Sequence, residues 1–255
     1  MKRKRKVKEK QISKQVHLHF SFLHGNEYGK KLDLSNQNLK GTKALKWKWL
    51  KSAVLNGADL SHSDLTHTSL SEAELREAKL NHANCFSAIF DNSDMSKCDL
   101  RDTELAHASF VDTNLTEAIA AGVEFSYSNF KNVICRNALL YGAEIDNSYV
   151  QKCDFRGADM RHSSLIGTYA NGSDFRGADC RGADFHGADL SHADFRGANL
   201  TDAKINYATV VGADFRGAII DNVNFNYSDL SNSDFRDAKF DNISEVGTIW
   251  DGCKK

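Results

Sequence analysis

The hydrophobic residues of this chain recur every five residues from Leu55 to Phe240, without an insertion. All 38 positions of the series are apolar, and the residue two places earlier is always small. A spacing of five advances an α-helix by about 140° per step and would scatter these residues around it. In a plain strand, an odd period would alternate between faces. The pattern instead predicts stacked coils in which each five-residue unit forms one short side and turns its apolar centre and small residue inward.

A longer repeat shows how many units form one coil. The string Asp-Phe-Arg-Gly-Ala begins at residues 154, 174, 194 and 214, and it returns as Asp-Phe-Arg-Asp-Ala at residue 234. The period of 20 predicts four units per coil, with the Phe residues of these strings stacked in one interior column. With layers about 4.8 Å apart, the predicted rod is on the order of 45 Å long.

The units also resemble a known family. Gly-Ala-Asp-Leu-Ser at residues 57–61 and Gly-Ala-Asn-Leu-Thr at residues 197–201 resemble the A-(D/N)-L-x-x signature of pentapeptide-repeat proteins. The resemblance covers about three quarters of the chain. It implies an all-β fold, a right-handed quadrilateral β-helix, here with a short N-terminal cap. Because members of one fold carry out different activities, it implies much less about function.

We divide the chain into four segments: a disordered basic arm (1–11), an N-terminal capping segment (12–51), the pentapeptide-repeat β-helix (52–243), and a C-terminal cap and tail (244–255). A cap is expected because open ends of a solenoid expose core and backbone edges.

Within the capping segment, apolar residues alternate with polar ones from Val16 to Phe22, which predicts a half-buried strand. Leu34 and Leu39 predict an imperfect first coil, out of phase with the main array, followed by a short excursion around Lys43–Leu50. At the other end the spacing breaks at Glu245, so we expect the array to fray there.

Charge is segregated along the 255 residues. Residues 1–51 hold 15 Lys and Arg against three acidic residues, and residues 52–255 hold 18 against 31. No apolar run approaches the roughly 18 residues of a membrane-spanning helix. The basic start is not followed by the apolar stretch of a secretory signal, so we expect a cytoplasmic protein.

Five of the six cysteines fall at inward positions, which predicts reduced packing residues and neither a disulfide framework nor a zinc site.

The predicted faces of the rod differ in charge. Asp and Arg flank each Phe of the longer repeat, and such solvated pairs contribute about 0–1 kcal/mol each. The face centred on Leu65 through Phe225 instead carries six acidic residues and one base. Three of its glutamates stack one coil apart, which is unfavourable unless counter-ions or a partner neutralise them. The candidate partner-binding face comprises Glu104, Glu124, Glu144, Asp146, Asp184, Tyr127, Tyr207 and Tyr227. An acidic surface kept for solubility is the alternative.

Two other surfaces are candidates for binding. Four outward hydrophobic residues form a candidate apolar patch, which is either a protein contact or chance exposure. Its members are Ile119, Ile134, Leu139 and Tyr141. The basic arm is suited to nucleic acid, anionic lipid or an import receptor, and a solubilising tail is the simplest alternative. Its residues are Lys2, Arg3, Lys4, Arg5 and Lys6.

These patterns predict a non-enzymatic protein that acts as a rigid protein-binding or scaffold module. The sequence shows no nucleophile, base and acid at a plausible spacing and no phosphate-binding loop, so we predict no catalytic residue, cofactor or metal. The resemblance to the quinolone-resistance group of the family implies an alternative, a DNA mimic that binds DNA gyrase or topoisomerase IV. A secreted bacterial effector is a second alternative. The partner's identity and the oligomeric state stay open.

Overall fold

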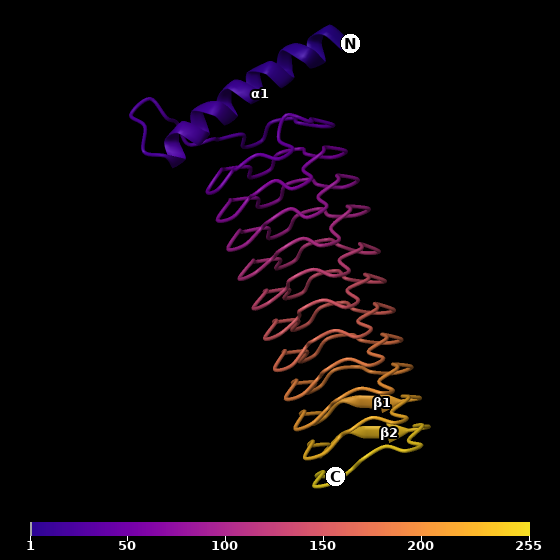
Figure 1. Cartoon of the computed structure of the whole chain (residues 1–255). Helices are drawn as coiled ribbons and strands as arrows, with labels where there is room; N and C mark the ends of the chain where they lie inside the picture. The colour runs from indigo at the N-terminus through magenta and orange to yellow at the C-terminus, as the bar shows by residue number, and fades with distance from the viewer. Residues whose placement is uncertain (1) are drawn as a thin grey trace.

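The computed structural model describes residues 2–255, with side chains from Glu9 onward. Figure 1 shows a rod of stacked coils with helix α1 (Lys2–Leu23) lying across its N-terminal end. Two short strands near the other end, β1 (Ile219–Asp221) and β2 (Lys239–Asp241), pair in parallel. Elsewhere the coils are joined by single-residue parallel bridges such as Glu74 with Asp94, and the numbers of these partners differ by 20. This spacing confirms the predicted coil of four five-residue units.

Outside the units that carry β1 and β2, the five-residue units contain a β-turn that directs the chain around a corner. In the unit centred on Leu55, the Ala58 amide donates to the Leu55 carbonyl at 3.0 Å, and Gly57 between them has φ +64°. A positive φ at the third residue is the mark of a type II turn. The next unit places His62 in the same conformation, with φ 58°. Gly at this position removes the steric cost that a side chain meets in left-handed backbone.

The buried residues form one continuous core along the rod axis, as predicted. Every apolar centre from Leu55 to Phe235 is buried. Within the Phe column, the ring centroids of Phe175 and Phe195 lie 4.7 Å apart with the planes 4° from parallel. Where the small inward residue carries a hydroxyl, a core carbonyl usually accepts from it, as when Thr68 Oγ1 donates to the Leu45 carbonyl at 2.8 Å, and Ser93 Oγ is the exception among the described residues because it is buried without a partner. Such bonds remove the cost of burying a polar group.

The N-terminal segment differs from the prediction, because it is helical. The strand expected over Val16–Phe22 and the disordered arm expected over residues 1–11 are replaced by α1, while Met1 lies outside the described residues. Ile12, Val16 and His19 are spaced by four and three residues, so they share one helix face, and all three are buried. Phe20, which the strand would have turned inward with Phe22, is 46% exposed. The segment therefore forms a helix and not the strand that the period-2 alternation predicted. A helix buries the face of Ile12, Val16 and His19 over the end of the core.

A buried histidine anchors α1 to the coils. The His19 ring is fully buried, with Nε2 3.0 Å from the Lys51 carbonyl and Nδ1 accepting from the Leu32 amide at 3.0 Å. These partners require a proton on Nε2 and none on Nδ1, which is the neutral ring. Burial lowers the pKa of His19 accordingly. The Glu9 carboxylate adds a second tie by accepting from Thr42 Oγ1 at 3.0 Å.

The coils begin earlier than the uninterrupted repeat does. Leu34 and Leu39 are buried in an imperfect first coil, as predicted, and Asp33 bridges Val54 at a spacing of 21. From Trp49 onward the spacing is 20, so one extra residue is absorbed between residues 39 and 45. The excursion expected around Lys43–Leu50 is a regular side of the coil, because its centres Leu45 and Leu50 are buried.

The fraying predicted at Glu245 does not occur, because residues 244–255 continue the array. Ser244 bridges Asn224, and Lys254 bridges Asp234, both at the regular spacing. Trp250 takes an inward position and packs on Phe235, with the ring centroids 5.3 Å apart.

Candidate partner-binding surfaces

The charged ladder beside the Phe column neutralises itself. Asp154 accepts from the Arg156 guanidinium at 2.8 Å, and Arg156 Nε lies 3.5 Å from the Asp174 carboxylate of the next coil. Partial burial alone would raise the pKa of Asp154, but hydrogen bonds from Arg156 and Arg136 lower it to about 2. The same pairing recurs at residues 174, 194, 214 and 234. Each arginine of this ladder thus has a carboxylate partner within the array.

The glutamates of the candidate partner-binding face are arranged differently. Parallel bridges join Glu104 to Glu124 and Glu124 to Glu144, so the three form one column across successive coils. All three are exposed, and none of their carboxylates makes a hydrogen bond or ion pair with any residue that the structure describes. We call this column the acidic strip. It is an uncompensated line of negative charge.

The other acids of that face have local partners. Asp146 accepts from Ser164 Oγ at 2.6 Å and from the Ile166 amide at 2.9 Å. Asp184 forms an ion pair with Lys204 at 3.0 Å. These two carboxylates therefore fix turns and neighbouring coils, and they do not extend the acidic strip.

An aromatic ladder runs beside the acidic strip on the same face. The ring of Trp47 stacks on His67 with centroids 3.9 Å apart, and Phe86 follows His67 at 5.9 Å. The ladder continues from Phe86 to His107 and from His107 to Tyr127, each at 5.3 Å. The sequence placed Tyr127 on this face but missed the other four members. Four of the five rings lie two residues after an apolar centre, in a single column, and this column was a signal that the sequence contained.

The remaining tyrosines form a separate patch. Tyr207 and Tyr227 are 58% and 55% exposed, and their rings stack with centroids 5.0 Å apart. Tyr207 lies four coils beyond Tyr127 along the rod, because each coil advances the residue number by 20. The candidate face is therefore two patches, one acidic and aromatic, the other aromatic.

The predicted apolar patch spans two faces. A parallel bridge places Ile119 beside Leu139, and Ile134 lies on the adjoining side between Asn114 and Asp154. Leu139 is 44% exposed. The guanidinium carbon of Arg161 sits 5.4 Å from the Tyr141 ring centroid, a cation–π contact that partly covers this residue.

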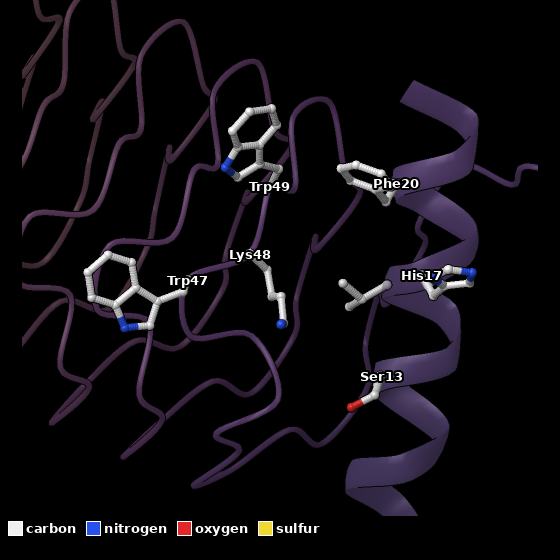
Figure 2. A pocket seen from close by; sticks show the side chains of 7 residues that line it. Ser13, His17, Phe20, Trp47, Lys48 and Trp49 are labelled. Carbon is white, nitrogen blue, oxygen red and sulfur yellow. The ribbon is translucent and has the colours of Figure 1, made fainter. Parts of the chain in front are cut away.

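At the N-terminal end, α1 and the first coil enclose a groove of about 430 Å³ that was not predicted (Figure 2). Trp47 and Trp49 are 61% and 64% exposed beside it, and Phe20 approaches from α1. The groove is lined by Ser13, Val16, His17, Phe20, Trp47, Lys48 and Trp49. The backbone of the predicted basic arm belongs to α1, and the side chains of Lys2 to Lys6 lie outside those that the structure describes.

The repeats and coils define a solenoid built from pentapeptides. The family model for pentapeptide repeats matches the chain in 8 copies, and the chain belongs to this family. The matched residues are 50–81, 78–116, 121–157, 138–177, 153–191, 178–217 and 218–242.

Several solved structures are similar to the chain. A pentapeptide repeat protein from the thylakoid lumen of Arabidopsis thaliana is 30% identical over 36% of this chain, with a TM-score of 0.35, and the chain spans 64% of its length. HetL, a protein involved in heterocyst differentiation regulation in the cyanobacterium Nostoc, is 23% identical over 91% of this chain and 92% of its own, with a TM-score of 0.25. QnrB1, a plasmid-mediated fluoroquinolone resistance protein, is 22% identical over 73% of this chain and 89% of its own, with a TM-score of 0.33. No curated protein sequence matches the chain significantly. Among the described residues, no helix has the length and apolar character needed to cross a membrane.

Proposed function

We propose that this protein is a non-enzymatic protein-binding module whose contact surface is the acidic strip with the aromatic ladder beside it. The observation that carries the proposal is a contrast in pairing. The aspartates of the Phe face each have an arginine partner, whereas Glu104, Glu124 and Glu144 have no cation among the described residues. The right-handed quadrilateral β-helix implied by the family resemblance is part of the same proposal.

The acidic strip and the ladder favour the same chemistry in a partner. Adjacent coils are about 4.8 Å apart, a separation at which exposed like charges repel. Arginine side chains from a partner would relieve this repulsion by pairing with the carboxylates, and their planar guanidinium groups stack on aromatic faces. The ladder rings of His107 and Tyr127 lie on the same two coils as Glu104 and Glu124. We therefore expect the partner to present a basic groove or an arginine-rich segment.

Rigidity of the rod supports this function. The coils are fixed by core packing and inter-coil hydrogen bonds, so the carboxylates are held in line before a partner arrives. A preorganised surface loses little conformational entropy on binding.

A DNA mimic that binds DNA gyrase or topoisomerase IV is the second candidate. The observation that favours it is the linear, unpaired arrangement of Glu104, Glu124 and Glu144 at the layer spacing of about 4.8 Å, because DNA also presents a regular line of negative charges, about 3.4 Å apart on each strand. This candidate is a special case of the first, with the DNA-binding groove of the enzyme as the basic partner.

The test replaces Glu104, Glu124 and Glu144 together by Gln. A matched control replaces Glu72, Glu77 and Glu117 by Gln, which changes the net charge equally on other columns. We expect an oligoarginine peptide to bind the wild type and the control alike, and to bind the acidic-strip variant about tenfold more weakly at about 0.15 M salt. If both variants weaken binding equally, the peptide responds to net charge alone, and the proposal fails.

Gyrase supercoiling in the presence of the same three proteins tests the second candidate. Inhibition by the wild type and the control, but not by the acidic-strip variant, would support DNA mimicry. If none of the three proteins affects supercoiling, DNA mimicry directed at gyrase is rejected. The peptide-binding result then decides the broader proposal.

A further inference from the structure

The groove at the N-terminal end combines exposed aromatic rings with unpaired positive charge. Lys48 separates Trp47 from Trp49 in the sequence, and its side chain extends from the coil toward α1 between the two indoles and Ser13 (Figure 2). Phe20 closes the groove from the helix side. The rings of Trp47, Trp49 and Phe20, together with His17 and one ammonium group, therefore line one concave surface, at a volume within the range of ligand sites.

The groove lies at the strongly basic end of the chain. The 15 Lys and Arg of residues 1–51 face only three acids, and the seven basic residues of positions 2–10 are all in α1. Lys46 and Lys51 are paired, with Asp64 at 3.0 Å and with Glu72 at 3.1 Å. Lys48 has no ion pair with any residue in the described part of the chain. The free charge at this end favours an anionic ligand, whereas the acidic shaft repels one.

We propose that this groove binds single-stranded nucleic acid, with bases stacked on Trp47 and Trp49 and phosphates held by Lys48 and by the exposed Lys10 and Lys14 of α1. Exposed rings beside a positively charged track are the features by which proteins bind single strands without sequence preference. One face of the Trp47 indole is occupied by His67 at 3.9 Å, so a base would stack on the opposite face and extend the aromatic ladder by one ring. A duplex keeps its bases stacked internally and cannot use the indoles in this way.

The helix itself argues against a lipid surface as the ligand. A helix that binds membranes in the interface plane needs a continuous apolar face toward the lipid. The apolar positions Ile12 and Val16 of α1 are buried against the coils. The exposed positions between them, Ser13 and Lys14, are polar. The exposed Phe20 and Phe22 are two residues apart, so they do not share one face of the helix. The anionic ligand is therefore one that offers flat rings together with its charges.

The experiment uses the full chain and a fluorescein-labelled oligothymidylate of about 15 nucleotides, within the site sizes seen for single-strand binders. We expect Trp47→Ala and Trp49→Ala each to weaken binding about tenfold, which corresponds to the loss of one stacked base. Tyr207→Ala is the matched control, because this exposed ring lies on the separate patch with Tyr227. The Tyr207→Ala variant should bind the oligonucleotide with the same affinity as the wild type. In a Trp250→Phe background, binding should also quench the indole fluorescence of the two remaining tryptophans.

Competition experiments decide among ligand classes. We expect neither a duplex of the same length nor vesicles of phosphatidylcholine with phosphatidylserine to displace the oligonucleotide at equal charge concentration. Displacement by vesicles would overturn the proposal in favour of a membrane contact, and displacement by duplex would reduce it to non-specific charge attraction. Unchanged affinity in both tryptophan variants would also overturn it, because the groove would then contribute nothing. The Gln variant of the acidic strip should bind the oligonucleotide at least as well as the wild type, so failure of this proposal can be distinguished from failure of the proposed function.

Discussion

The stacked phenylalanines make a sharp prediction about stability. Phe195 lies in the middle of the Phe column, fully buried, with ring centroids 4.7 Å from Phe175 and 5.0 Å from Phe215. Phe195→Ala would remove the stacking contacts with both of these rings and an edge contact with Phe185 at 5.9 Å. The surrounding backbone is tied on both sides by inter-coil hydrogen bonds, so the site cannot collapse to fill the space.

The expected cost follows from these contacts. Phe→Ala in a protein core costs about 3–5 kcal/mol, the larger values applying where the cavity does not relax. Each aromatic pair contributes about 0.5–1.5 kcal/mol beyond the buried area. We therefore expect about 5 kcal/mol, the upper end of the range. Phe86→Ala, the same substitution at a ring that is 38% exposed, should cost about 1 kcal/mol or less.

Urea denaturation of both variants measures the difference, and native-state hydrogen exchange locates it. In a solenoid each coil contacts only its neighbours, so lost amide protection should centre on residues 175–215 and fade in more distant coils. A cost for Phe195→Ala no larger than that of Phe86→Ala would refute the inference that burial and stacking in the Phe column stabilise the rod. Protection lost uniformly along the rod would refute the nearest-neighbour description.

Three further predictions concern titration and reactivity. Because burial lowers the pKa of His19 below its usual 6.5, its stabilising contribution is complete above that pH and is lost as the pH falls below it. Protection of the Leu32 amide should therefore decrease as the pH falls below 6.5, and His19→Gln should remove this dependence. The hydrogen bond from Arg236 lowers the pKa of Asp234 from 3.8 to about 2, so the stability contributed by this pair should be complete above 3.8 and be lost as the pH falls from there toward 2, and Arg236→Gln should raise the carboxyl pKa observed by NMR. Burial raises the pKa of all six thiols, and only Cys253 is partly exposed, so a thiol reagent should modify at most one cysteine per native chain and all six after unfolding.

The sequence predicted the array because inward positions of a solenoid are chemically restricted. A centre such as Leu55 must fill the core, and its small partner Ala53 must fit a corner, so both leave a strict five-residue signature. The repeated string around Phe155 then fixed the coil at four such units, which the parallel bridges confirm. These constraints act unit by unit, so the prediction did not depend on contacts between distant segments.

The ends escaped prediction because no repeated constraint acts on them. Residues 12–23 carry two overlapping apolar patterns, and only contact with the first coil decides which face is buried. His19 shows the difficulty, since a polar residue became the most buried anchor of α1 through partners at Leu32 and Lys51. The groove was missed for the same reason, because it exists only where α1 crosses the coil that carries Trp47.

The outward positions are where function must be sought, because the fold does not dictate them. Three of the five residues in each unit point outward, and the rod forms whether they are Ser, Asp or Tyr. On the Phe face these positions stabilise neighbouring coils through Asp and Arg pairs such as Asp174 with Arg176. The acidic strip at Glu124 does the opposite, since its unpaired charges repel along the column. A surface that the fold neither requires nor gains from is best explained by a partner, and the strip and the basic groove at Trp47 call for partners of opposite charge at two separate places on one rigid rod.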